Sequence, residues 1–194
     1  MYLIVLFSYI LLFLLVETIK RKSKCSSEIT RKILHVFSGI GVIYWSNYLT
    51  KNEFIFVTCI FLFLFIINLR KKMLHSLIIT NRKTYGEVTY LLGLLIYSLL
   101  LYSQRNYFIL GILVLMLPDA IAGLANHFLN KPYKEMVHIF SYALLTFLIT
   151  ILFLPLHLSL LFVLILTFVE FYSSYGLDNF TVPLAFSLVV RLFL

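Results

Sequence analysis

Asp119 is a carboxylate inside an apolar stretch of the chain. An acidic side chain at membrane depth costs on the order of 3 kcal/mol on insertion scales, so such a residue usually marks a functional site. A structural ion pair, for example with Arg31, is the alternative. On a helix, Asp119 shares a face with Ala122, Gly123 and Asn126. Small residues on that face would let another helix or a ligand come close.

A second group of oxygen-bearing side chains comes late in the chain. Glu170 ends one apolar segment, and Asp178 and Asn179 begin the next after a turn at Gly176. Carboxylate and amide oxygens suit Mg²⁺, which binds through one or two carboxylates, waters and substrate phosphates. Asp and Asn also cap helices, which gives Asp178 and Asn179 a purely structural interpretation. The functional interpretation is a Mg²⁺ site formed by Asp119, Asp178 and Asn179.

Two further groups could contact phosphates or a hydroxyl. Arg31, Lys32 and His35 would share one helical face with Glu28, and cations at such a face can hold phosphate oxygens. Alternatively, Arg31 and Lys32 only fix the topology and His35 is a buried histidine with its hydrogen bonds satisfied. Glu87 could bind Mg²⁺ or a hydroxyl, or it could simply stabilise the N-terminus of a helix.

The elements that must position these side chains are almost entirely apolar. The 194 residues are 62% hydrophobic and 12% charged, whereas average usage is ~45–50% apolar and ~25% charged. We therefore predict one all-α integral membrane domain over residues 1–194, a polytopic transmembrane helix bundle of about seven or eight spans. The expected segments lie near residues 2–17, 33–50, 54–70, 88–104, 107–127, 137–154, 156–172 and 180–194.

The loops between these segments differ in charge. All but Lys51, Arg105 and Arg191 of the 16 Lys and Arg residues fall in the loops after the first, third and fifth segments. The positive-inside rule makes those loops cytoplasmic and, with eight spans, leaves both termini outside. It also explains the net charge of +8 without a nucleic-acid partner. The candidate polar residues then all lie near the cytoplasmic face.

In their order along the chain these motifs resemble the polyprenol kinase superfamily, which includes dolichol kinase, phytol kinase and the CTP-dependent diacylglycerol kinase. Phosphatidate cytidylyltransferases are more distant relatives. The resemblance covers roughly residues 28–184 and is divergent, because Asn126 and Asn130 stand near the positions where glycines are expected. It is carried by Arg31-Lys32-x-x-His35, Gly86-Glu87-x-Thr89-Tyr90, Asp119-x-x-Ala122, Glu170 and Gly176-x-Asp178-Asn179-x-Thr181-x-Pro183.

This resemblance implies a membrane lipid-alcohol kinase that transfers a phosphoryl group from CTP, or from another nucleoside triphosphate such as ATP, to an isoprenoid alcohol. A polyprenol, dolichol, phytol or geranylgeraniol would be the acceptor, with its hydroxyl at the inner interface and its tail in the lipid. Mg²⁺ would be held by Asp119, Asp178 and Asn179. Asp119, Glu87 and Glu170 are the implied catalytic residues, and either glutamate could orient or deprotonate the alcohol. The implied phosphate-binding and nucleotide-binding residues are Arg31, Lys32, His35, Asn126, Lys131 and Lys134.

Two other functions share these features: a phospholipid cytidylyltransferase, and a non-catalytic relative that binds or transports lipid. The sequence leaves the lipid chain length, the nucleotide base and the oligomeric state open.

Overall fold

The computed structural model describes residues 1–22, 26–71, 85–128 and 134–194, with only the helical backbone for residues 126–128 and 134. All regular structure in this part of the chain is α-helical, which confirms the predicted all-α class. The eight described helices are α1 (Tyr2–Lys22), α2 (Ser27–Trp45), α3 (Lys51–Lys71), α4 (Gly86–Leu101), α5 (Arg105–Phe128), α6 (Lys134–Thr150), α7 (Leu156–Tyr172) and α8 (Asp178–Phe193).

Each helix matches one predicted segment, but several begin earlier than the apolar pattern suggested. The largest difference is in α2, which begins at Ser27 rather than near residue 33. The side chain of Ser26 caps this helix by accepting a hydrogen bond from the backbone N–H of Ile29 at 3.3 Å. Hydropathy alone misses such polar first turns. As a result, Arg31 and Lys32 lie inside the helix rather than in the loop before it.

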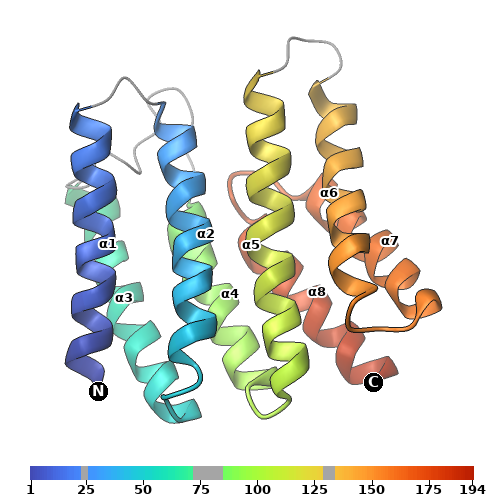
Figure 1. Cartoon of the computed structure of the whole chain (residues 1–194), viewed down its shortest axis with the longest axis horizontal. Coiled ribbons are helices and arrows are strands. Elements are labelled where there is room, and N and C mark those ends of the chain that lie inside the picture. The colour runs from blue at the N-terminus through green and yellow to red at the C-terminus, as the bar shows by residue number, and fades with distance from the viewer. Residues whose placement is uncertain (23–25, 72–84, 129–133) are drawn as a thin grey trace.

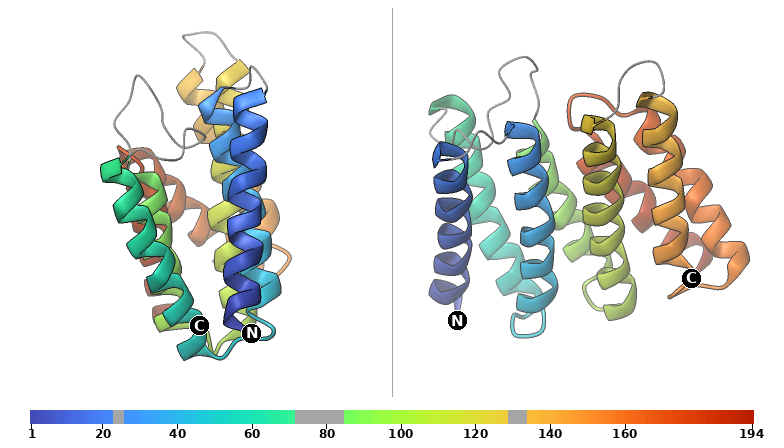
Figure 2. Two further views of the ribbon diagram at one scale, coloured as in Figure 1. Left: turned by 90° about the vertical axis from the view of Figure 1, so that its left-hand side faces the viewer. Right: turned by 45° about the horizontal axis from the view of Figure 1, so that its top comes forward.

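The helices pack in two layers (Figures 1 and 2). One layer contains α1, α2, α5 and α6, and the other contains α3, α4 and α8. Helix α7 packs against both α6 and α8. In the middle of the bundle α2 contacts α5 and α4 contacts α8, while α5 also contacts α4 and α8 across the layers. Successive helices alternate in direction, and both termini lie at the same end of the bundle (Figure 1).

Glycine allows the closest approach of two helices at the centre. A Cβ atom at Gly93 of α4 would overlap the backbone carbonyl oxygen of Asn179 in α8. Small residues at helix contacts let backbones approach in this way. Below this contact the fully buried rings of Tyr97 and Phe186 pack edge to face, with centroids 5.6 Å apart. The first turn of α8 is therefore held against α4.

Three of the described helices are long and apolar enough to cross a membrane: α1, α3 and residues Arg105–Ala125 of α5. Three shorter apolar helices lie at Gly86–Leu101, Glu135–Thr150 and Leu156–Tyr172. Helix α1 exposes large apolar side chains along its length, including Leu3 and Phe7. Exposed apolar surface of this extent is typical of a membrane-facing helix rather than of a monomer in water. These helices fit a multi-pass membrane protein.

Candidate functional site

Three carboxylates from three helices meet at one end of the bundle. Asp119 comes from the second half of α5, Glu170 from the last turn of α7, and Asp178 from the first residue of α8. Each offers one oxygen atom, and these oxygens all lie within 4.8 Å of one another. Negative charges this close repel unless a proton or a cation compensates them. The cluster is therefore a candidate cation site, and it includes Glu170, which sequence reasoning had not placed among the metal ligands.

Asn179 adds an unsatisfied oxygen beside this cluster. Its Nδ2 donates to the carbonyl oxygen of Gly86 at 3.4 Å. Its Oδ1 is buried and has no hydrogen-bond partner among the described residues. Buried polar atoms are normally paired, so an orphaned one needs an explanation such as an ion or a ligand. The three carboxylates are a donor set that fits a hard divalent cation such as Mg²⁺, and Asn179 directly follows one of them in the first turn of α8.

Lys32 holds the carboxylate of Asp119. Its Nζ donates to Oδ1 of Asp119 and, at 3.0 Å, to the backbone carbonyl oxygen of the same residue. The two side chains are only 6% and 12% exposed. Gly123 leaves room for the lysine, because a Cβ atom there would lie 2.5 Å from Lys32 Cε. The ion-pair partner of Asp119 is thus Lys32, not the Arg31 that the sequence offered as an example.

His35 supports the same carboxylate from the next turn of α2. Its Nε2 lies 3.7 Å from Oδ2 of Asp119 and 3.0 Å from the carbonyl oxygen of Leu115. Its ring packs against Tyr90 with centroids 4.6 Å apart. Lys32 therefore bonds to one carboxylate oxygen of Asp119, while His35, hydrogen-bonded to the Leu115 carbonyl, lies beside the other.

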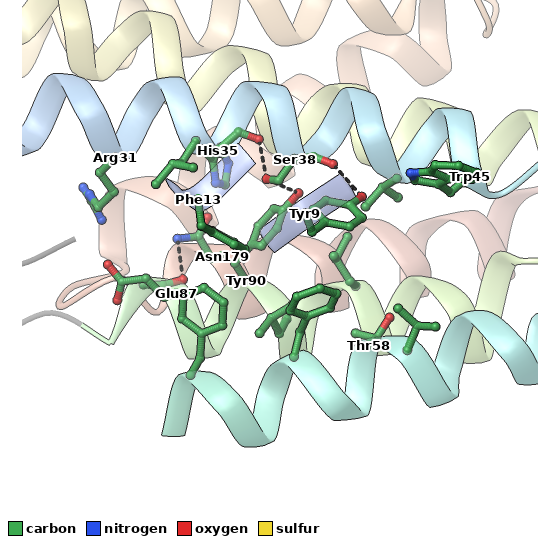
Figure 3. Close-up of a pocket in the computed structure, with 18 of the residues that line it drawn as sticks. Tyr9, Phe13, Arg31, His35, Ser38, Trp45, Thr58, Glu87, Tyr90 and Asn179 are labelled. Carbon is green, nitrogen blue, oxygen red and sulfur yellow. Dashed lines mark hydrogen bonds between the residues drawn. The ribbon is translucent and has the colours of Figure 1, made fainter. Parts of the chain in front are cut away.

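Arg31 and Glu87 line the same pocket as Asp119, and each has a polar atom without a hydrogen-bond partner among the described residues. Arg31 Nε and Glu87 Oε1 are buried, and neither has a hydrogen-bond partner in the described part of the chain. Both residues line the same pocket, Arg31 from α2 and Glu87 from the first turn of α4 (Figure 3). With Asn179 Oδ1 they form a group of three orphaned polar atoms at one pocket end. A bound polar group would satisfy them.

Apart from these polar residues, the pocket is lined mostly by apolar side chains. It encloses about 90 Å³, within a space of about 900 Å³ that includes the open surroundings, and it lies among helices α1 to α4. Asp119 and Asn179 line it from α5 and α8. Most of its remaining wall is aromatic or aliphatic (Figure 3). The arrangement can hold an anion or a hydroxyl at one end and a hydrocarbon along its length.

Sequence reasoning missed His138 of α6. Its Nε2 lies 3.4 Å from Oε1 of Glu170, and its Nδ1 is buried without a partner among the described residues. The residue belongs to no motif. Its position near one end of an apolar segment, like that of the other polar residues, was the available signal.

Eight of the predicted site residues thus lie together at one end of the bundle: Arg31, Lys32, His35, Glu87, Asp119, Glu170, Asp178 and Asn179. Lys131 lies outside the described residues, as do the side chains of Asn126 and Lys134. The individual roles stay predictions. Comparisons with protein-family models, with curated proteins and with solved structures find no match.

Proposed function

We propose that this chain is a membrane lipid-alcohol kinase that uses Mg²⁺ and CTP, or another nucleoside triphosphate. The observation that supports this most is the cluster of Asp119, Glu170 and Asp178 beside the polar end of an apolar pocket. Phosphoryl transfer depends on positioning and charge neutralisation more than on covalent chemistry. A reaction between a triphosphate and a lipid alcohol needs a cation site and an apolar site side by side.

In this proposal the residues have three roles: holding the cation, positioning a cation ligand, and acting on the alcohol. Asp119, Glu170 and Asp178, with the amide oxygen of Asn179, would hold Mg²⁺, which when bound supplies neutralisation of phosphate charge. Lys32 and His35 keep the Asp119 carboxylate in position through the contacts described above. A residue engaged in the cation site is poorly placed to act on the alcohol as well. Of the two candidate glutamates, Glu87 is therefore assigned to the alcohol.

The transfer step uses the pocket residues. The carboxylate of Glu87 accepts the hydroxyl proton as the alcohol oxygen forms its bond to the γ-phosphorus. The bond between that phosphorus and the β–γ bridging oxygen breaks, and the nucleoside diphosphate leaves. Arg31, whose Nε is unsatisfied, holds phosphate oxygens, which guanidinium groups do in a bidentate manner.

The proposal includes a topology in which all eight helices span the membrane and the candidate site faces the cytoplasm. Two observations support it. The helices alternate in direction with both termini at one end (Figure 1). The last turns of α1 and α3, at the opposite end, carry Lys20, Arg21, Lys22, Arg70 and Lys71. Basic residues concentrate on the cytoplasmic side of membrane proteins, where nucleotides are also available.

The direct test is incubation of the detergent-purified protein with Mg²⁺, γ-labelled CTP or ATP, and a panel of isoprenoid alcohols and diacylglycerol. We expect label in an isoprenoid phosphate. Asp119→Asn should reduce transfer by about a hundredfold or more, by analogy with the loss of other electrostatic catalytic groups, while the protein still inserts. Glu135→Gln, an exposed acid in the first turn of α6, is the matched control. Full activity of purified Asp119→Asn would overturn the assignment.

The same purified protein and labelled nucleotides distinguish two alternative functions. A phospholipid cytidylyltransferase would put label from the α-phosphate, and none from the γ-phosphate, into lipid. A non-catalytic lipid-binding or transport protein is favoured by one observation: Lys32 already compensates the charge of Asp119 without a metal. Failure of Mg·CTP to change the unfolding temperature would support that alternative.

A further inference from the structure

The pocket is elongated and runs parallel to the helices. On α2 its lining extends from Arg31 to Trp45, which at about 1.5 Å per residue is a length of about 21 Å. The lining of α3 and α4 follows the same direction, from Phe65 to Phe54 and from Glu87 to Leu94. Every charged lining residue lies at the end marked by Arg31 and Glu87. The pocket therefore resembles a tube with one polar end.

Aromatic side chains of α1 and α3 form its outer wall. Phe13 packs against Phe65 with ring centroids 5.2 Å apart, and Tyr9 packs against Phe61 at 5.3 Å. Both pairs meet edge to face, a favourable arrangement for aromatic rings. Gly41 of α2 lets Tyr9 approach, because a Cβ atom there would lie 2.8 Å from the tyrosine oxygen.

The polar groups halfway along the tube bond to one another. Tyr9 Oη donates to the backbone carbonyl of Ser38 at 3.2 Å. Ser38 Oγ donates to the backbone carbonyl of His35 at 3.0 Å and is hydrogen-bonded to Tyr90 Oη at 3.3 Å (Figure 3). A hydrocarbon passing this point would leave none of these hydroxyls newly unpaired. The middle of the tube can therefore accept an apolar chain without the cost of burying an unsatisfied polar group.

The end of the tube farthest from Arg31 and Glu87 is bounded by packed side chains. Trp45 is fixed by a hydrogen bond from Nε1 to Ser8 Oγ at 3.1 Å. Phe54 packs edge to face on Phe108, with centroids 5.8 Å apart. Leu49, which also lines the pocket, lies in the turn after α2, where its carbonyl oxygen accepts a hydrogen bond from Tyr102 at 2.6 Å. These residues limit how far an occupant can extend.

We propose that this tube takes up the tail of a single-chain lipid alcohol, with the hydroxyl at Glu87 and the tail end at Trp45 and Phe54. At roughly 1.2 Å per bond of an extended chain, about 21 Å accommodates about 16 backbone carbons, or four isoprene units. Two-tailed lipids and much longer polyprenols exceed the tube. The tail would thus lie inside the bundle, not in the surrounding lipid as the sequence had suggested. This inference rests on the proposed function for the chemistry at the hydroxyl.

The test is direct binding of labelled isoprenoid alcohols of two, four and eight units to the purified full chain, without nucleotide. Val42, 4% exposed, lines the half of the tube nearer to Trp45, whereas Ile40 on the same helix is 49% exposed. We expect Val42→Trp to weaken binding of the four-unit alcohol by about tenfold or more and to change binding of the two-unit alcohol by less than about twofold. Ile40→Trp should bind both like the unchanged protein. Equal effects of the two tryptophans would overturn the proposal.

A second measurement does not depend on a variant that folds. A four-unit alcohol with a photoreactive group at its tail end should cross-link the unchanged protein near Trp45, Leu49 or Phe54. Cross-links confined to outward-facing residues such as Leu144 would contradict the proposal. Different results would contradict the kinase proposal and the tail-binding proposal. Tail binding without phosphoryl transfer would count only against the kinase, and transfer that is independent of chain length and of Val42→Trp would count only against the tube.

Discussion

Lys32 of α2 donates to both the carboxylate and the backbone carbonyl oxygen of Asp119 in α5. One ammonium group thereby fixes the side chain and the main chain of the same acid. The pair lies where α2 packs against α5, next to the cluster that Asp119 forms with Glu170 and Asp178. The position of the candidate cation site is therefore tied to the packing of these two helices.

Replacing Lys32 should destabilise the protein because it leaves a buried carboxylate without its partner. We expect Lys32→Met to lower the free energy of unfolding by about 3–5 kcal/mol, the usual cost of breaking a buried ion pair on one side. Unfolding in detergent, followed by circular dichroism, measures this. Adding Asp119→Asn should recover part of the loss, whereas Lys71→Met at the exposed end of α3 should have little effect. A Lys32→Met protein as stable as the original would contradict a buried pair.

Gly93 should not tolerate a side chain. Gly93→Ala places a methyl group against the backbone carbonyl of Asn179, and a backbone cannot move aside cheaply. We expect a loss of about 1–3 kcal/mol of stability, typical of overpacking, together with weaker Mg²⁺-dependent stabilisation. Gly39→Ala is the matched control, because its methyl group meets the flexible side chain of Met116. Equal stability of the two variants would show that α4 and α8 are not in such close contact.

His138 should matter for cation binding through Glu170. We expect His138→Asn to raise the Mg²⁺ concentration needed for half-maximal thermal stabilisation by about ten- to a hundredfold, as for other groups that orient a metal ligand. His157→Asn, at an exposed position at the start of α7, serves as the control. Binding of the isoprenoid alcohol should not change in either variant. An unaltered Mg²⁺ requirement in His138→Asn would remove this histidine from the site.

The membrane orientation is open to chemical labelling. In a chain with Cys25 and Cys59 replaced by serine, Leu152→Cys lies in the exposed turn after α6, and Tyr175→Cys lies in the turn before α8. An impermeant maleimide should label Leu152→Cys in intact cells and Tyr175→Cys only after lysis. Labelling of both positions from outside, or the reverse pattern, would reject the proposed orientation.

The helices of the described residues, and the gathering of the polar residues at one end of the bundle, were predictable from the sequence, since both follow from apolar segment length and the charge of the loops. The lateral order of the helices was not. Helix α8 lies between α4 and α7, and this order brings Glu170 and Asp178 to Asp119. Spans that are apolar all round carry no periodic signal for which face points inward. Which face of each helix points inward decides that Lys32, rather than Arg31, pairs with Asp119.

The pocket was beyond sequence reasoning for a related reason. Tyr9, Phe61 and Tyr90 look like ordinary apolar residues of three separate spans. Only packing shows that their rings enclose a space instead of filling it. Aromatic residues scattered along spans are common, so their types alone carry little information.

Halfway along the tube, the hydroxyl of Tyr9 is bonded to the main-chain carbonyl of Ser38, and the hydroxyl of Tyr90 to the Ser38 side chain. Each of these hydroxyls already has a hydrogen-bond partner, so the wall at this point offers an alkyl chain mainly a shape to fit. It can sense how thick and how long that chain is, and it can sense double bonds only through the shape that they give the chain. A fully reduced prenol and its polyunsaturated counterpart of the same length would then differ in affinity only through the shape and stiffness of their chains.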